Sequence, residues 1–176
     1  MAAVSTSRRS TAGIVFIIAG ALLALAVLLP VLNGPSVPWL IAIAFIAIAV
    51  AFGILGIGAV NSTLAKVMLI AAAVGWLLLA LAALGLALPS VLVTIAALVA
   101  GVAGLIAAVV LYLGKEVRNL AAIIFIVTTA LGLLYLLPMI GVSLAGLTLV
   151  IAVLFAAGLI VTGVLFWQKE RARTRR

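Results

Sequence analysis

The sequence of 176 residues contains no cysteine, no histidine and no aspartate, and its acidic residues are Glu116 and Glu170. Without thiols and imidazoles, the chain cannot form a disulfide, a zinc site of the usual kind or a His-ligated haem. A nucleophile would also lack a base, because no histidine or aspartate is available to accept its proton. We therefore expect a protein that is not an enzyme, with no metal, no cofactor and no catalytic residue.

Charged residues are also scarce, at 7% of the chain, whereas 70% of the residues are hydrophobic and the mean hydropathy is +1.66. An ordinary soluble domain is about 45–50% apolar and about 25% charged. The composition is typical of an integral membrane protein with almost no mass outside the bilayer. The strands of a membrane barrel alternate polar and apolar residues, whereas these runs are apolar on every face. We therefore predict membrane-spanning helices.

The chain divides into six apolar segments, each near the ~20 residues that a helix needs to cross a bilayer. They are 11–32, 38–60, 64–88, 90–113, 117–137 and 143–167. The predicted fold class is an all-α, polytopic membrane protein with six transmembrane helices. Its predicted organisation is a disordered cytoplasmic N-terminus at 1–10, a transmembrane domain at 11–168 and a basic cytoplasmic tail at 169–176.

The turns between the segments are of two kinds. Three turns contain Pro or Gly without charge, at 33–38, 88–90 and 138–143. Of the other two, the turn at 61–63 is followed by Lys66, and the turn at 114–119 contains Lys115 and Arg118. With six spans, all ten basic residues fall on the side of the two charged turns and both tails. Basic loops stay in the cytoplasm, so we expect a multi-pass protein of the bacterial inner (plasma) membrane with both termini cytoplasmic. The same rule accounts for the net charge of +8 without nucleic acid as a partner.

The spans are arranged as three sequential helical hairpins. Lys66 and Arg118 begin the third and fifth spans, and Leu-Pro recurs near the outer ends of spans one, three and five, at 29–30, 88–89 and 137–138. An internal triplication would produce this pattern. Any six-span chain with short turns would also look like three hairpins, so both interpretations stay open.

Three short hairpins, the Leu-Pro pairs and glycines in the second helices resemble the HdeD-type family of small six-span membrane proteins. The glycines are Gly53, Gly101, Gly104 and Gly158, and the resemblance covers nearly the whole chain. It implies a role in acid-stress resistance or membrane integrity and implies no catalytic residues.

Small residues at four-residue spacing are the candidates for helix packing, because this spacing puts them on one helix face where backbones can approach closely. The preferred ridge is Ala100, Gly104 and Ala108, and Gly53 and Gly158 are further candidates. The ridge would serve the internal bundle or a partner subunit, and the spacing does not separate these uses.

A few polar or aromatic residues inside the spans could contact a ligand. Thr128, Thr129 and Tyr135 could line a small polar pocket, although threonines in membrane helices more often serve packing. Trp76 falls in the middle of span three, where it would pack between helices or contact a lipid, quinone or other hydrophobic ligand.

The charged residues at the membrane surface have simpler expected roles. We expect Glu116 and Glu170 to pair in solvent with Lys115, Arg118 and Lys169, far from any acid–base role. The basic tail at 169–176 orients the last span and attracts anionic lipid at the cytoplasmic face of the bilayer.

Three function classes follow. The first is a non-enzymatic membrane protein of the HdeD type, with a homo-oligomer as one form. The second is an accessory subunit of a larger membrane complex. The third is a binding or transport component for an apolar small molecule, which would normally show more polar groups facing the bundle interior than this chain has.

Overall fold

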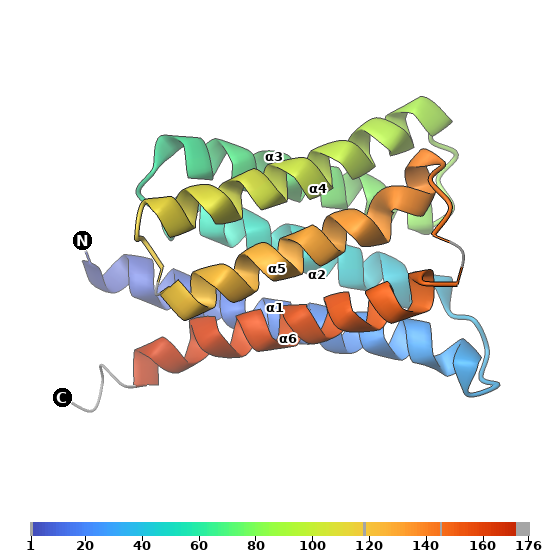
Figure 1. Cartoon of the computed structure of the whole chain (residues 1–176), viewed down its shortest axis with the longest axis horizontal. Helices are drawn as coiled ribbons and strands as arrows, with labels where there is room; N and C mark the ends of the chain where they lie inside the picture. The colour runs from blue at the N-terminus through green and yellow to red at the C-terminus, as the bar shows by residue number, and fades with distance from the viewer. Residues whose placement is uncertain (1, 118, 145, 172–176) are drawn as a thin grey trace.

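The protein consists of six long helices that run alternately up and down (Figure 1). In this computed structural model, the described residues are 2–117, 119–144 and 146–171, with side chains described for 7–117, 119–144 and 146–168. The helices are α1 (Ala2–Val31), α2 (Pro38–Gly58), α3 (Thr63–Ala83), α4 (Ser90–Leu113), α5 (Asn119–Leu136) and α6 (Thr148–Arg171), and a short 3-10 helix, η1 (Leu137–Ile140), follows α5. All six are long and apolar enough to cross a membrane. The predicted all-α, six-span fold class is confirmed.

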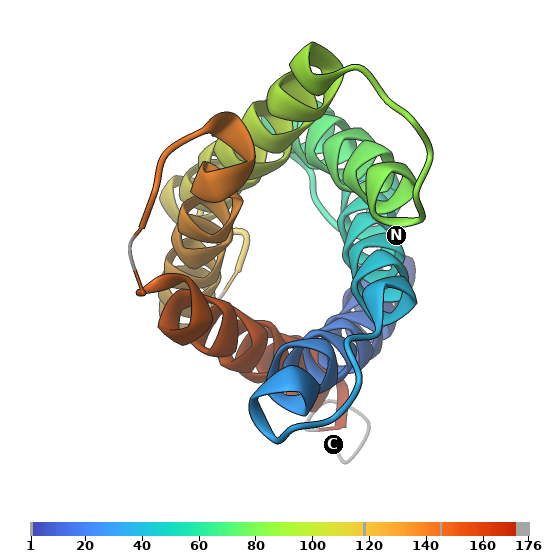
Figure 2. The ribbon, with the colours of Figure 1, turned by 90° about the vertical axis from the view of Figure 1, so that its right-hand side faces the viewer.

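The six helices form a closed ring. Each helix contacts its neighbours in the sequence, and α1 also packs along α6, so the first and last helices close the circle (Figure 2). Contacts between α2 and α3 are as extensive as those between α1 and α2. The three predicted hairpins are therefore continuous with one another in space, and no hairpin stands apart as a separate unit.

Local sequence signals fix the helix ends. Pro38 occupies the first turn of α2, where its missing N–H costs nothing. The Ser62 hydroxyl caps α3 by accepting a hydrogen bond from the Ala65 N–H at 3.4 Å. Gly85 and Gly141, at φ +87°, supply the left-handed backbone that follows α3 and η1. Four to seven residues connect consecutive long helices, with η1 counted as the end of α5.

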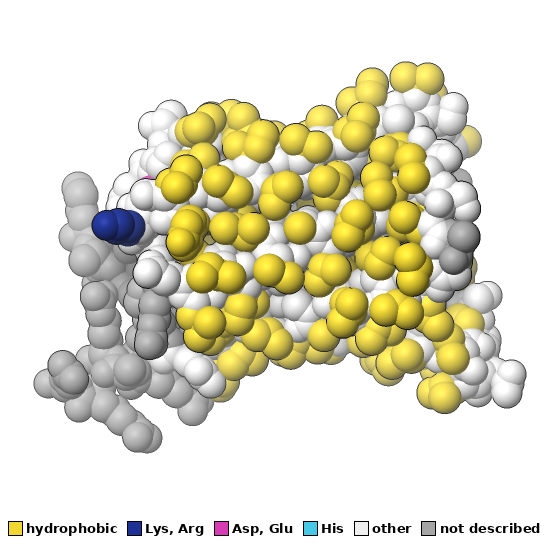
Figure 3. All heavy atoms as spheres, viewed as in Figure 1, with side chains coloured by type: hydrophobic (Ala, Val, Ile, Leu, Met, Phe, Trp, Pro, Cys, Tyr) yellow, Lys and Arg dark blue, Asp and Glu magenta, His cyan; other side chains and the backbone are white. Residues whose placement is uncertain are grey.

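The outer surface is an apolar belt with charge at one end. The exposed large hydrophobic side chains along all six helices are mainly Ile, Leu and Val. On the face that Figure 3 shows, hydrophobic side chains form a broad belt. The described charged side chains, Arg8, Arg9, Lys66, Lys115 and Glu116, lie in or beside the helix ends near both termini. We call this the charged end of the bundle. A continuous apolar belt on a ring of spanning helices is the surface of a multi-pass membrane protein.

Three predicted boundaries need correction. Residues 2–10 were expected to be disordered, but they continue α1, because extending an existing helix adds one hydrogen bond per residue without a new nucleus. The third span ends at Ala83, before Gly85, and α6 begins at Thr148, after Gly146 at φ +82°. Arg118 and residues 172–176 lie outside the described residues, as do the side chains of 169–171, so the predictions for the basic tail and Glu170 stay predictions.

Candidate functional site

Phenylalanines fill the centre of the ring. All six phenylalanine side chains are at most 6% exposed. Phe16, Phe52, Phe125 and Phe166 form one cluster towards the charged end, with ring centroids 5.5–6.4 Å apart. Phe45, Trp76, Tyr135 and Phe155 form a second cluster towards the opposite end, with ring centroids 5.1–6.3 Å apart. The opening that the ribbons leave along the ring axis is therefore occupied by aromatic side chains.

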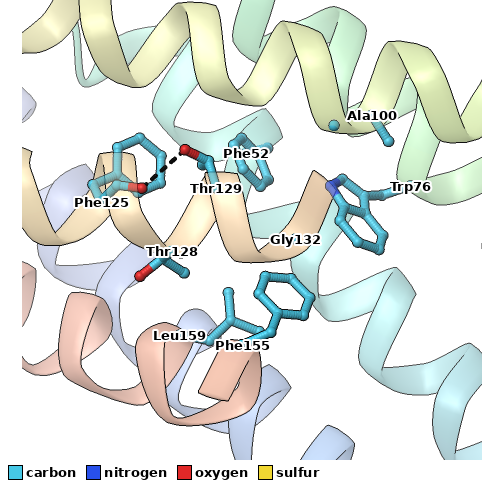
Figure 4. Close-up of a pocket in the computed structure, with 10 residues that line it drawn as sticks. Phe52, Trp76, Ala100, Phe125, Thr128, Thr129, Gly132, Phe155 and Leu159 are labelled. Carbon is cyan, nitrogen blue, oxygen red and sulfur yellow. Dashed lines mark hydrogen bonds between the residues drawn. The ribbon is translucent and has the colours of Figure 1, made fainter. Parts of the chain in front are cut away.

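A small cavity lies between the two aromatic clusters (Figure 4). Its volume is about 10 Å³, and its lining comes mainly from α4, α5 and α6 with Phe52 and Trp76 added. A cavity of this size is at the lower limit for one water molecule. Binding sites for small molecules usually begin at about 300 Å³. This cavity therefore has no room for a solute in this conformation.

The predicted ligand residues lie together at this cavity. Trp76, Thr128 and Thr129 line it, and Tyr135 sits just beyond it, with its ring 5.8 Å from that of Phe155 and 6.3 Å from that of Phe45. Trp76 is 2% exposed and stacks on Phe155 at 5.8 Å and 17°. The sequence placed these residues in two different spans, and the ring arrangement brings them to one place.

The threonine hydroxyls at the cavity are satisfied by the protein itself. Thr129 Oγ1 donates to the carbonyl oxygens of Phe125 and Ile126, each at 3.0 Å. Thr128 Oγ1 lies 2.8 Å from the carbonyl oxygen of Ile124 and 3.0 Å from Thr162 Oγ1 on α6. These bonds match the packing role of threonines in membrane helices. The Thr128–Thr162 bond adds a polar link between α5 and α6 that the sequence analysis did not identify.

Most of the predicted packing residues lie at helix contacts. Ala100 packs on Gly75, where a Cβ would stand 2.7 Å from the Ala100 nitrogen, so α3 and α4 approach backbone to backbone. A Cβ on Gly158 would stand 2.7 Å from Thr128 Oγ1. Ala108 is fully buried, and Gly104 turns inwards, where an added Cβ would stand 3.5 Å from the ring of Phe52. The ridge on α4 is therefore used inside the ring.

Gly53 requires a correction, and the tightest contact was missed. A Cβ on Gly53 would meet no atom within 4 Å, so this glycine mediates no close helix packing here. The closest approach is between α1 and α6, where a Cβ on Gly13 would stand 2.6 Å from the Gly163 carbonyl oxygen, and one on Gly163 would overlap the Gly13 carbonyl oxygen. Four-residue spacing could not identify this pair, because its two members lie on helices at opposite ends of the sequence.

Glu116 and Arg9 form a partly buried polar cluster at the charged end. The Glu116 carboxylate accepts hydrogen bonds from the backbone N–H groups of Asn61 at 2.7 Å and Ser62 at 2.8 Å. The Arg9 guanidinium donates to the carbonyl oxygens of Ala59 at 2.6 Å and Glu116 at 2.8 Å. The two charged groups are 4.0 Å apart, and their side chains are 18% and 11% exposed. We call these two residues and their backbone partners the Arg9–Glu116 cluster.

The backbone around Lys115 positions Glu116. α4 ends with two backbone bonds, from Lys115 N–H to the Tyr112 carbonyl and from Glu116 N–H to the Leu111 carbonyl, while Lys115 adopts φ +51°. This is the Schellman arrangement, which reverses the chain and turns the next side chain back. Glu116 then meets the turn that precedes α3, and Arg9 meets the carbonyl end of α2. Each charge faces the helix end of opposite partial charge.

The expected role of Glu116 must be corrected accordingly. It was expected to pair in solvent with Lys115 and Arg118, but it binds the α2–α3 turn and lies beside Arg9. Arg118 is outside the described residues, so no statement about it follows. One feature of the sequence pointed to a special role for Glu116. Acidic residues are rare in this chain, and Glu116 is the only one between the two tails.

Comparisons with known proteins give no relative for this chain. No family model, no curated protein and no solved structure matches it. Among the described residues, no group of three or more His, Cys, Asp or Glu side chains is placed to hold a metal ion.

Proposed function

We propose that this protein is a non-enzymatic membrane protein whose closed helical ring serves membrane integrity, in the manner of the HdeD-type proteins that its hairpins and Leu-Pro pairs resemble. The observation that carries the proposal is the packed interior between the two aromatic clusters, where the cavity that they line is only about 10 Å³. A path for ions or polar solutes needs water or ionisable groups within the membrane. The described parts of the six spans carry no Lys, Arg or Glu residue in their central turns.

The sealed interior predicts that the protein does not conduct. Vesicles that contain the purified protein and a trapped pH-sensitive dye should lose an imposed proton gradient no faster than protein-free vesicles, because the aromatic clusters leave no continuous water path. A channel-forming peptide added at the end calibrates the signal. A protein-dependent collapse of the gradient would contradict the proposal and would favour the transport class.

The charge asymmetry supports an orientation with the charged end in the cytoplasm. Because the chain has no cysteine, single cysteines can report it. Exposed Ser36 and Ser143 lie in uncharged turns, exposed Ser90 begins α4 after another uncharged turn, and exposed Asn61 lies at the charged end. In intact cells, cysteines at the first three positions should react with an impermeant maleimide, and one at Asn61 should react only after permeabilisation. Labelling at Asn61 from outside would reverse the orientation.

A further inference from the structure

A groove on the outer surface lies between α1 and α2 at the charged end. Its volume is about 270 Å³, and it is lined by Arg8 and Thr11 of α1 and by Ile54 and Ile57 of α2. We call it the Arg8 groove. It faces away from the ring interior, because Arg8, Thr11 and Ile57 are exposed and Ile57 is 73% exposed. In a membrane, a groove at this height meets lipid headgroups on one side and the upper parts of acyl chains on the other.

Two adjacent arginines have different surroundings. Arg9 points into the bundle, donates to the carbonyl oxygens of Ala59 and Glu116, and lies 4.0 Å from the Glu116 carboxylate. Arg8 makes one hydrogen bond, a long one of 3.4 Å to the Ile57 carbonyl oxygen, and has no carboxylate partner among the described side chains. A guanidinium has five N–H donors in a planar fork that suits phosphate. Most of the donors of Arg8 therefore remain available to an anion in the groove.

The position of Arg8 across the end of α2 depends on a glycine. A Cβ on Gly58 would overlap the Arg8 guanidinium, so only glycine lets this side chain lie over the helix end. Thr11 adds no donor, because its hydroxyl already donates to the Ser7 carbonyl oxygen at 3.1 Å. The groove thus combines one cationic anchor with an apolar wall, Ile54 and Ile57, which are almost one helical turn apart and run along the direction of an acyl chain.

We propose that the Arg8 groove binds one anionic phospholipid, with its phosphate on the Arg8 guanidinium and its first acyl segment along Ile54 and Ile57. The charge selects the lipid, because lipid tails are as apolar as isoleucine and the wall alone gives no preference. A net-anionic headgroup suits a lone guanidinium, whereas the choline cation of phosphatidylcholine opposes it.

Native mass spectrometry of the whole protein, released from mild detergent, tests this site. With phosphatidylglycerol added, the wild type should retain one lipid per chain, and Arg8→Gln should weaken retention about tenfold, as expected for losing a charge-assisted hydrogen bond. Arg8→Lys, which keeps the charge and loses the fork, should fall between the two. Lys115→Gln removes the same charge from an exposed turn between α4 and α5, across the ring from the groove. It should weaken retention less than about twofold, because salt screens distant surface charges.

Two further arms separate the lipid from other sources of binding. Phosphatidylcholine with the same chains should be retained much less than phosphatidylglycerol, and inorganic phosphate at the same concentration should not displace the lipid. Displacement by phosphate would identify a free-anion site, and equal losses for Arg8→Gln and Lys115→Gln would identify non-specific attraction. Either result would overturn the proposal. The outcome does not depend on the flux experiment, because a conducting or a sealed ring could carry this groove.

Discussion

Replacing Gly163 with alanine is expected to destabilise the helical ring by about 3 kcal/mol, at the upper end of the usual cost of overpacking. The new Cβ would overlap the carbonyl oxygen of Gly13 on α1. Backbone atoms cannot rotate away as a side chain can, so α1 and α6 would have to separate along the contact that closes the ring. Close van der Waals packing is the main force between helices in lipid, and this separation would weaken it directly. Unfolding in a denaturing-detergent titration measures the loss.

Gly53→Ala is the matched control for Gly163→Ala. Both positions are glycines inside long helices, and both substitutions remove the flexibility that glycine brings to a helix. A Cβ on Gly53 would meet nothing within 4 Å, so this variant should be neutral or more stable by up to about 1 kcal/mol. The packing around the two glycines therefore predicts a loss of stability for Gly163→Ala and no loss for Gly53→Ala. Similar effects at both positions would show that α1 and α6 do not meet as described.

The second large effect is expected at Glu116. Glu116→Ala should destabilise the protein by about 3 kcal/mol, because it leaves the Arg9 guanidinium without its carboxylate and two backbone N–H groups without their acceptor. Glu116→Gln keeps one acceptor oxygen and should cost about half as much. The side chain is 11% exposed, so water can replace little of the lost interaction. The same detergent titration measures both variants.

The neighbouring Lys115 provides the control for Glu116. Its side chain is exposed, and Lys115→Ala should change stability by no more than about 0.5 kcal/mol. Combining Arg9→Ala with Glu116→Ala should cost clearly less than the sum of the single changes, because both residues belong to one cluster. Additive losses would mean that Arg9 and Glu116 act independently, and the proposed link between α1 and the two turns would then be wrong.

The amino-acid sequence by itself determined the fold class and which turns lie at the same end of the bundle. Lipid offers no hydrogen-bond partners to the backbone. Six long apolar runs therefore form helices, in which each backbone N–H and C=O group bonds within its own segment. Charge cannot remain in hydrocarbon, so Lys66, Lys115 and the N-terminal arginines had to lie at the ends of the spans. With short turns and six spans, the charged turns and both termini then fall on one side. These inferences need only length, composition and order along the chain.

Only the tertiary structure decided which face of each helix turns inwards. In water, a helix shows its buried face by an apolar stripe, but lipid tails are as apolar as leucine, so inner and outer faces here look alike in sequence. For this reason the sequence could not separate Gly163, which lies at the contact that closes the ring, from Gly53, where an added Cβ would meet no atom within 4 Å. It also could not place the six phenylalanines on the ring axis or direct Arg9 inwards and Arg8 outwards. The inward or outward direction of these side chains depends on shape complementarity between helices that are distant in the sequence. The contact between α1 and α6, at opposite ends of the chain, is the clearest case.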